Sequence, residues 1–147
     1  MSTHPIFNQA IEIAQSYDVS TPKNGLVLYS ISYLPTTKNR DKAFEFVQKQ
    51  KGFQTIENTP CGAKLVELNF SHSQYNLTSK EISQIWSIAS KRMIEQAQGN
   101  IIAFVDGVDY RSVFYQTELP NILKNPHINT INNEDKYLFA KKLQPAK

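Results

Sequence analysis

Hydrophobic and polar residues follow a helical spacing along three stretches of the chain. Residues 5–17 place their apolar side chains on one face, which predicts an amphipathic first helix. A second helix is expected over about 39–51. The longest begins at the capping box over 78–81 and keeps an apolar stripe until it stops at Gly99. The first half of the chain is therefore expected to be mainly helical.

A shorter helix is expected before the longest one. Thr59 followed by Pro60 is typical of a helix start, with the threonine as N-cap and the proline at the first helical position. This helix should run to Leu68. The polar stretch 69–77 that follows predicts a loop.

Four short runs of β-branched, aromatic and aliphatic residues predict strands. They cover residues 26–31, 100–105, 112–117 and 128–131. Residues 132–134 can cap a last helix, which has a basic end and runs to Leu143. Because helix and strand signals alternate in the second half, we expect an α/β fold. Its helical N-terminal half should pack on a small, mostly parallel sheet in the C-terminal half.

Composition indicates a single globular domain over residues 1–147. The chain is long enough to bury a real core and too short for two ordinary domains, and 40% of its residues are hydrophobic. Residues 1–20 form a helical segment that either belongs to this domain or remains from a delivery sequence. The net charge of +3 comes mainly from scattered lysines, which favours a solvated surface over a nucleic-acid-binding face.

Cysteine usage and hydropathy restrict the compartment. The single cysteine, Cys61, excludes an intrachain disulfide and is expected to act as a small buried hydrophobe. No apolar run approaches a membrane span, and residues 1–20 lack the basic and apolar regions of a signal peptide. The sequence therefore favours a reducing, aqueous place of action with no membrane partner. Export would need a route other than the general secretory signal.

Several common kinds of site are absent from the sequence. His4, His72 and His127 lie far apart, without the spacing that metal ligands need, so we expect no bound metal. The five glycines are dispersed, and none of them forms a phosphate-cradling loop. No Gly-x-Ser-x-Gly motif marks a serine nucleophile.

The segment from Ser112 to Glu118 is the strongest candidate for a site. It follows the apolar run 101–105 and ends on a carboxylate, although glutamate is disfavoured in strands and costly to bury. The simplest explanation is that Glu118 points to solvent just before a turn at Pro120. The alternative is that the carboxylate is there for chemistry.

Three further pieces precede this segment. In chain order they are Leu28-Tyr29-Ser30, Thr55-Ile56-Glu57, and Trp86 with Ser90 four residues on. Taken singly, each has an ordinary explanation, because the aromatic side chains would pack in a core and the glutamate would be solvated in a turn.

Together, in this order and spacing, the pieces resemble the motifs of the ADP-ribosyl cyclase and NAD glycohydrolase family. That family has an aromatic-Ser pair after an apolar strand, a Thr-Leu-Glu-Asp-Thr stretch, a helix with Phe-Trp-x-x-x-Ser-Arg-Arg-Phe, and a closing Ser-x-Phe-x-x-x-Glu. The resemblance covers about residues 26–131 and implies an ADP-ribosyl cyclase-like core. The patterns Glu118-Leu119-Pro120 and Asn125-Pro126 are similar to those of C-terminal toxin domains of bacterial polymorphic toxins.

The resemblance implies a role for each matching residue. Glu118 would be the catalytic carboxylate beside the nicotinamide ribose, and Glu57 would contact the carboxamide side of the ring. Tyr29 and Trp86 would form the walls around the nicotinamide. The ribose and phosphate groups would be held by Ser30, Ser112 and Phe114.

The chain also departs from the eukaryotic members of that family. Ile31 stands where they have an arginine, and Arg111 or Arg40 is the expected replacement for its phosphate contact. Tyr29 is a smaller aromatic than their tryptophan, which leaves the balance of hydrolysis and cyclisation open. Their disulfides are absent too, which fits a domain that acts in a reducing cytosol.

The activity implied by the resemblance is cleavage of NAD⁺ to nicotinamide and ADP-ribose, with NAD⁺ as substrate and no cofactor. The toxin-like patterns imply an effector delivered into the cytoplasm of a target cell, and an immunity protein that protects the producer. Two alternatives remain open: a different toxin chemistry, such as a ribonuclease or ADP-ribosyltransferase, and a non-enzymatic binding or immunity protein. In the latter, Trp86 and Glu118 would be purely structural.

Overall fold

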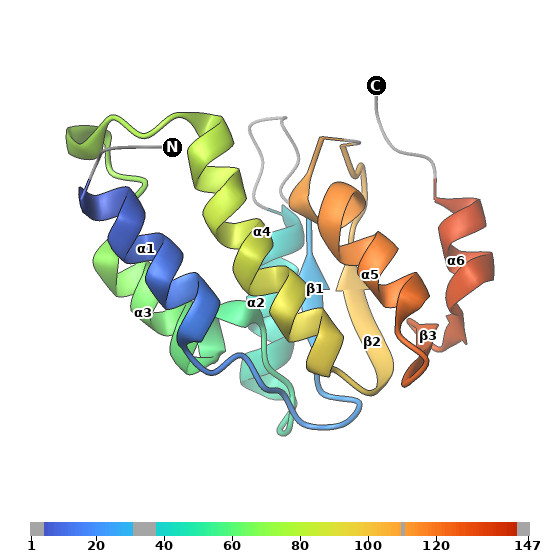
Figure 1. Ribbon diagram of the computed structural model, residues 1–147. Helices are drawn as coiled ribbons and strands as arrows, with labels where there is room; N and C mark the ends of the chain where they lie inside the picture. The colour runs from blue at the N-terminus through green and yellow to red at the C-terminus, as the bar shows by residue number, and fades with distance from the viewer. Residues whose placement is uncertain (1–4, 31–37, 110, 144–147) are drawn as a thin grey trace.

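The computed structural model describes residues 5–30, 38–109 and 111–143, whose elements are drawn in Figure 1. The helices are α1 (Pro5–Ser16), α2 (Lys38–Lys49), α3 (Pro60–Leu68), α4 (Ser79–Gln96), α5 (Leu119–Lys124) and α6 (Lys136–Lys142). The strands are β1 (Val27–Tyr29), β2 (Gly99–Phe104), β3 (Ile128–Ile131) and β4 (Glu134–Asp135). Short helical turns are η1 (Ile56–Asn58), η2 (Ser73–Tyr75) and η3 (Phe114–Glu118).

Within the described residues, the strands form one sheet in the order β1-β2-β3-β4. β1 and β3 both run parallel to β2, and β4 returns antiparallel to β3. The expected α/β class with a mostly parallel sheet is confirmed. Because β1 and β2 are parallel, their carboxyl ends meet at one edge, at the top in Figure 1.

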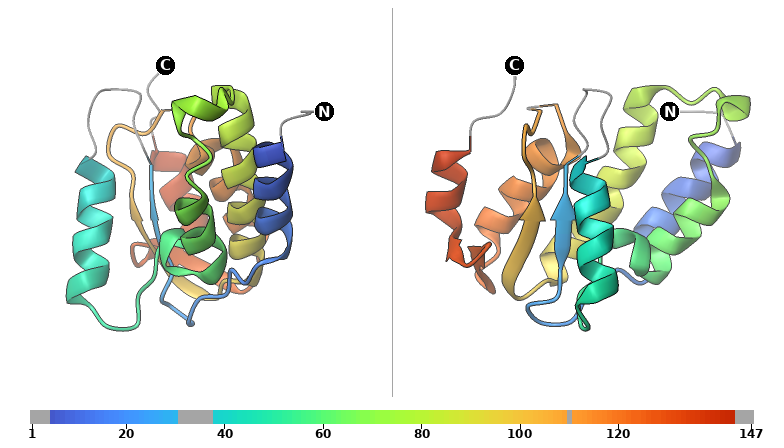
Figure 2. Two further views of the ribbon diagram at one scale, coloured as in Figure 1. Left: turned by 90° about the vertical axis from the view of Figure 1, so that its left-hand side faces the viewer. Right: turned by 180° about the vertical axis from the view of Figure 1, so that it is seen from behind.

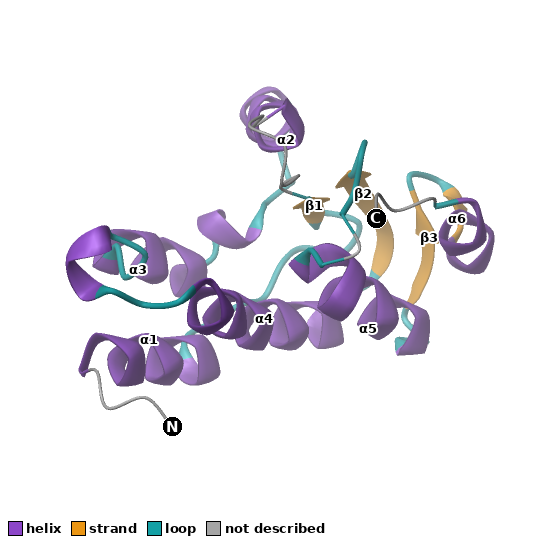
Figure 3. Cartoon of the chain, turned by 90° about the horizontal axis from the view of Figure 1, so that it is seen from above, coloured by secondary structure: helices purple, strands orange, loops and turns teal. Residues whose placement is uncertain are grey.

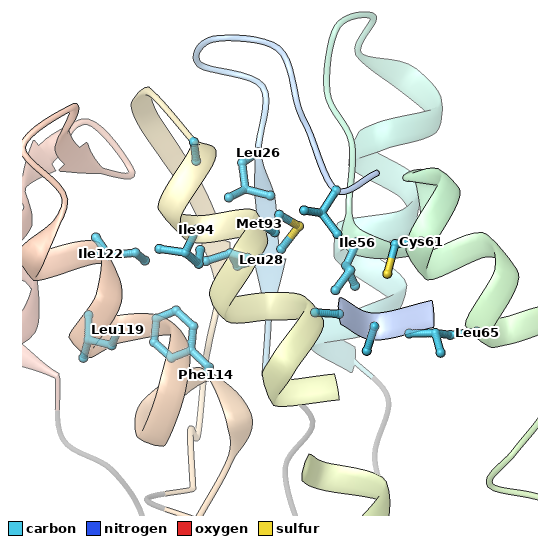
Figure 4. Packing of buried hydrophobic residues seen from close by; sticks show 14 of the residues in the cluster. Leu26, Leu28, Ile56, Cys61, Leu65, Met93, Ile94, Phe114, Leu119 and Ile122 are labelled. Carbon is cyan, nitrogen blue, oxygen red and sulfur yellow. The ribbon is translucent and has the colours of Figure 1, made fainter. Parts of the chain in front are cut away.

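Helices cover both faces of this sheet. Seen from above, α4 and α5 lie along one face and α2 lies over the other (Figure 3). Helix α1 packs on the outer side of α4, and α3 lies to the side of the sheet, next to α1 and η1. The side view in Figure 2 shows the same order of layers. The core fills the space between β1, β2 and α4, where Figure 4 shows Met93 and Ile94 of α4 next to Leu28 of β1.

The predicted helix starts are confirmed at two positions. Thr78 and Glu81 form the expected capping box, in which the Glu81 N–H donates to Thr78 Oγ1 at 3.0 Å and the Thr78 N–H donates to Glu81 Oε1 at 2.9 Å. Thr59 caps α3 by accepting a hydrogen bond from the Gly62 N–H at 3.1 Å. Cys61 is buried, as expected.

The predicted cap of the last helix is wrong. Asp135 is the N-cap of α6, since its carboxylate accepts from the N–H groups of Tyr137 and Leu138, each at 3.1 Å. Asn132 and Asn133 instead take the left-handed backbone of a tight turn, with φ of 52° and 64°. That turn joins β3 to β4, so α6 begins later in the chain, with Asp135 as its N-cap.

Helix α1 is part of the core. Phe7, Ala10, Ile13 and Ala14 are buried against the rest of the domain. The Arg92 guanidinium of α4 also donates to the carbonyl oxygens of Ala14 and Tyr17, at 2.6 and 2.9 Å, which satisfies acceptors at the end of α1. Residues 5–17 are therefore integrated with α4 by both packing and hydrogen bonds.

Shortening a buried side chain of α1 should destabilise the whole domain. For Ile13→Ala we expect the free energy of unfolding to fall by about 3 kcal/mol, because the substitution removes buried methyl groups and leaves a cavity. Urea unfolding measures this change. The matched control is Gln9→Ala on the exposed side of α1, which should change the value by less than about 0.5 kcal/mol. Equal stability of the Ile13→Ala variant and the wild type would contradict the placement of α1.

Candidate active site

The site begins at the carboxyl edge of the parallel strands. Tyr29 is the last residue of β1 and pairs in register with Phe104 of β2. Beyond them, the buried Asn39 side chain donates to the carbonyl oxygens of Ser30 and Asp106, both at 2.9 Å, and so ties the two strand ends together. In open α/β sheets this edge is where ligands bind.

Tyr29 and Glu57 form a hydrogen-bonded pair at this edge. The Tyr29 hydroxyl donates to Oε2 of Glu57, which η1 carries beside β1. Burial, followed by the charge and hydrogen bond of Glu57, raises the pKa of Tyr29, so its hydroxyl keeps its proton at neutral pH. Oε1 of Glu57 is buried and has no hydrogen-bond partner among the described residues.

Glu118 is a buried carboxyl group at the end of η3. Its residue is 6% exposed, so the simplest expectation, a solvated glutamate, is wrong. Burial raises its pKa to about 7, and the negative charge of Glu57 adds to this rise. A hydrogen bond from the buried Ser90 hydroxyl of α4 acts in the opposite direction, because it favours the carboxylate. Glu118 also raises the pKa of Tyr29 through its charge, which places the three ionisable groups in one electrostatic cluster.

The predicted strand over 112–117 is wrong, because this segment forms the π-helix η3. The Ser112 hydroxyl accepts from the Tyr115 N–H at 3.1 Å, and the Ser112 carbonyl accepts from the Gln116 N–H at 2.9 Å, which starts a helical turn. The Leu119 N–H then donates to the Phe114 carbonyl five residues earlier. Such π-turns are rare and occur frequently at functional sites.

Helix α4 lies against η3 and supplies two more of the expected residues. Trp86 is half-buried and packs on Phe70, with ring centres 5.7 Å apart. Ser90 lies one turn further along the same helix and forms a hydrogen bond with Glu118. The sequence motif contained Ser90 but did not reveal this partner. The Ser87 hydroxyl accepts from the Thr117 hydroxyl at 3.3 Å, which joins α4 to η3 a second time.

Three other expected site residues already have partners in the fold. The Arg111 guanidinium binds the Asp109 carboxylate, with Nη2 3.0 Å from Oδ2, and lowers the pKa of Asp109. The Ser112 hydroxyl is used in the turn into η3. Phe114 is 1% exposed and belongs to the hydrophobic core.

Ser30 follows β1 directly, at the edge of the sheet. Its hydroxyl is buried and forms no hydrogen bond with any other described residue. Ile31 lies outside the described residues. The structure thus brings together Tyr29, Glu57, Ser90 and Glu118.

The described residues contain no group of three or more His, Cys, Asp or Glu side chains placed to hold a metal ion. None of the helices in residues 5–30, 38–109 and 111–143 has the length and apolar character of a membrane span.

The arrangement of helices and sheet defines an α/β protein with a fold similar to that of the ADP-ribosyl cyclases. The Aplysia cyclase, solved with the substrate NGD and the product cGDPR, is 19% identical and superimposes with a TM-score of 0.55 over 75% of this chain and 48% of that chain. This chain thus spans about half the length of that cyclase.

Two structures of CD38 match over more of their own length. CD38 in a study of a covalent enzyme–substrate complex is 15% identical, with a TM-score of 0.56 over 92% of this chain and 83% of that one. Porcine CD38 with a covalent intermediate is 19% identical, with a TM-score of 0.54 over 85% of this chain and 66% of that one. No family model and no curated protein sequence matches the chain. At these identities the likeness is one of fold.

Proposed function

We propose that this protein is an NAD⁺ glycohydrolase that cleaves the bond between nicotinamide and ribose. Its products would be nicotinamide and ADP-ribose, with some cyclic ADP-ribose. The observation that carries this proposal is the buried carboxyl of Glu118 beside the Tyr29–Glu57 pair, at the carboxyl edge of a parallel sheet. The fold likeness to the Aplysia cyclase, which was solved with the substrate NGD, supports the same kind of chemistry.

The residue types suit this reaction. The nicotinamide ring of NAD⁺ is cationic, and aromatic side chains such as Tyr29 and Trp86 attract a cation to their faces. Cleavage of the bond releases neutral nicotinamide and leaves positive charge on the ribose carbon, as in glycoside hydrolysis. The Glu118 carboxylate stabilises that charge as it develops, and burial strengthens the effect because water does not screen it.

A single carboxylate is sufficient for this mechanism. The leaving group departs as a neutral base, so no acid needs to protonate it. Water then attacks the ribose carbon and releases a proton, which gives ADP-ribose. Attack by the adenine ring of the same substrate molecule gives the cyclic product instead, so access of water to the site sets the ratio of the two.

The raised pKa of Glu118 predicts a pH dependence of catalysis. In the free protein the carboxyl becomes ionised as the pH rises through about 7, and the ionised form is the reactive one. We expect kcat/KM to increase about tenfold per pH unit below pH 7 and to level off above it. Bound substrate should lower the pKa of Glu118, since a cation favours the carboxylate, so kcat should level off at lower pH.

Initial rates of nicotinamide release from pH 5 to 9 test this prediction. Exposed acidic groups outside the cluster, such as Glu67, serve as the control, because Glu67→Gln should leave the profile unchanged. A kcat/KM that falls with rising pH would contradict the assignment of Glu118 as the catalytic carboxylate.

We further propose that the protein acts as a toxin in the cytoplasm of a target cell, where it depletes NAD⁺, and that an immunity protein inhibits it in the producer. The support is the similarity of Glu118-Leu119-Pro120 and Asn125-Pro126 to polymorphic toxin domains. Expression in a host without the immunity protein should lower cellular NAD⁺ and stop growth. Harmless expression of an active enzyme would contradict the toxin role.

Analysis of the products distinguishes the proposed reaction from other toxin chemistries. Chromatography of NAD⁺ incubated with the purified protein should show nicotinamide, with ADP-ribose and cyclic ADP-ribose together in equal molar amount. An ADP-ribosyltransferase would instead leave ADP-ribose attached to a protein or nucleic acid. A ribonuclease would cleave RNA and leave NAD⁺ intact.

A further inference from the structure

Glu118 lies at an irregular point of the helical backbone. On its N-terminal side η3 is a π-turn, in which the Leu119 N–H donates to the Phe114 carbonyl five residues earlier. On its C-terminal side Pro120 has no N–H to donate to the preceding turn. The regular hydrogen bonds that fix a residue within an α-helix are therefore interrupted on both sides of Glu118.

Apolar packing holds η3 and α5 against α4 but does not fix their rotation. Near Ile94 of α4, the segment buries three core side chains, those of Phe114, Leu119 and Ile122 (Figure 4). Hydrophobic contacts are not directional, so they fix the rotation of a segment less tightly than hydrogen bonds do. A small rotation would move the carboxyl group of Glu118, and a displacement of about 1 Å at a reacting group can cost about 100-fold in rate.

Thr117, the residue directly before Glu118, is held by two hydrogen bonds. Its hydroxyl donates to the Ser87 hydroxyl of α4 at 3.3 Å. Its carbonyl oxygen accepts from Nδ2 of Asn121, in α5, at 2.7 Å. Both bonds are partly buried, where water competes less for these groups. They hold Thr117 from α4 and from α5, and so fix the direction in which the next side chain leaves the backbone.

Two hydroxyl groups of α4 reach η3, and they lie one turn apart. Ser87 contacts Thr117. Ser90, three residues later on the same side of the helix, forms its hydrogen bond with Glu118. Consecutive residues of η3 are thus bound by adjacent turns of one helix. Ser90 acts on the carboxyl group directly, whereas Ser87 acts through the backbone, and Ser87 is not part of the sequence motif that contains Trp86 and Ser90.

We propose that Ser87, Thr117 and Asn121 are positioning residues that hold the Glu118 carboxylate against the reacting ribose carbon and away from water. This inference rests on the proposed function. Among the described residues, the titratable groups coupled to Glu118 are Glu57 of η1 and Tyr29 of β1. The three positioning side chains are neutral, so their loss acts through placement and not through charge. Without them the carboxyl group turns toward water, which favours its ionised form.

The test compares Thr117→Val, which removes the hydroxyl and keeps the branched shape, with Thr117→Ser, which keeps the hydroxyl. Thr117→Val should lower kcat for nicotinamide release from NAD⁺ about tenfold and change KM little. Its kcat/KM should also level off at a lower pH than in the wild type, since the pKa of Glu118 moves from about 7 toward the ordinary value of 4.5. Thr117→Ser should be close to the wild type in both respects. Asn121→Leu, which removes the donor to the Thr117 carbonyl, should have the same two effects as Thr117→Val.

A double-mutant cycle of Ser87→Ala and Thr117→Val tests the hydrogen bond itself. Because both substitutions remove the same bond, the double variant should lose little more activity than either single variant. The control for loss of a serine hydroxyl is Ser83→Ala, at an exposed residue of α4, which should keep the wild-type kcat and pH profile. Additive losses, or an unchanged kcat and pH profile in folded Thr117→Val, would overturn this inference while leaving NAD⁺ cleavage intact. A folded wild type that releases no nicotinamide would overturn the proposed function and this inference together.

Discussion

Glu118→Gln is expected to lower the rate of nicotinamide release by about 10³-fold or more. Glutamine keeps the shape of the side chain and removes the negative charge that would stabilise the ribose cation. Loss of one preorganised electrostatic group commonly costs 10²–10³ in rate, and a full charge facing a developing cation in a buried site stands at the upper end. KM should change less than kcat, because the group acts mainly in the transition state.

The same substitution is expected to stabilise the fold at alkaline pH. The folded-state pKa of Glu118, about 7, lies above the ordinary value of 4.5, so the folded protein binds more protons than the unfolded chain between these values. Glu118 therefore does not lower the free energy of unfolding below pH 4.5. As the pH rises from 4.5 to 7, the free energy of unfolding falls, because the buried carboxyl resists ionisation. The cost reaches about 3 kcal/mol above pH 7, and glutamine, which is neutral at every pH, avoids it.

Urea unfolding at pH 5 and pH 8 measures this effect. Relative to the wild type, the Glu118→Gln variant should gain stability mainly at pH 8. The control is Glu67→Gln, at an exposed residue of α3, which should show no such pH-dependent gain. Activity close to that of the wild type, or the same stability difference at both pH values, would show that Glu118 does not carry a buried charge in the active form.

Gly62→Ala is the second substitution with a large expected effect, although it lies outside the site. A Cβ at this position of α3 would stand 1.8 Å from the Ile56 carbonyl oxygen and 3.0 Å from Cα of Glu57. The backbone must move, because that oxygen is also tied to Thr59. We expect a loss of about 3 kcal/mol in stability, typical of severe overpacking. The accompanying shift of Glu57 should lower kcat/KM for NAD⁺ by about 100-fold.

Thermal unfolding and initial rates check the two effects separately. Ala63→Ser, at the next and exposed residue of the same helix, is the matched control and should be close to the wild type in both. If Gly62→Ala keeps full activity with normal stability, then the tight packing of α3 against η1 is not what places Glu57.

The sequence was sufficient to predict most helices and the class of the fold. The capping box at Thr78 and the Thr59-Pro60 start are local signals, and local hydrogen bonds decide them in the folded chain. Strand β2 was likewise predicted from its apolar run, because a buried parallel strand shows few polar residues. These elements needed no knowledge of distant contacts.

The segment around η3 was mispredicted because its local preference and its packing disagree. Val113, Phe114, Tyr115 and Thr117 are typical strand residues, yet the Ser112 cap and contacts with α4 turn them into a π-helix. A strand would have alternated its side chains between two faces. The helical turn instead buries both Phe114 and Glu118, which lie four residues apart.

The candidate site was predicted as a set of residues and not as a set of contacts. The sequence order identified Tyr29, Glu57 and Glu118, but their separations of tens of residues give no information about which atoms meet. The hydrogen bond from Tyr29 to Glu57 and the contact of Ser90 with Glu118 depend on how η1 and α4 pack on the sheet edge. Arg111 was expected to face phosphate, and its ion pair with Asp109, two residues away, was missed.

The most direct test of the central claim is the rate of nicotinamide release from NAD⁺ by purified wild-type protein and Glu118→Gln at pH 8. We expect steady release by the wild type, in step with the loss of NAD⁺, and about 10³-fold less by the variant. No release by a folded wild-type protein, or equal release by both proteins, would contradict the assignment of Glu118 as the carboxylate of an NAD⁺-cleaving site.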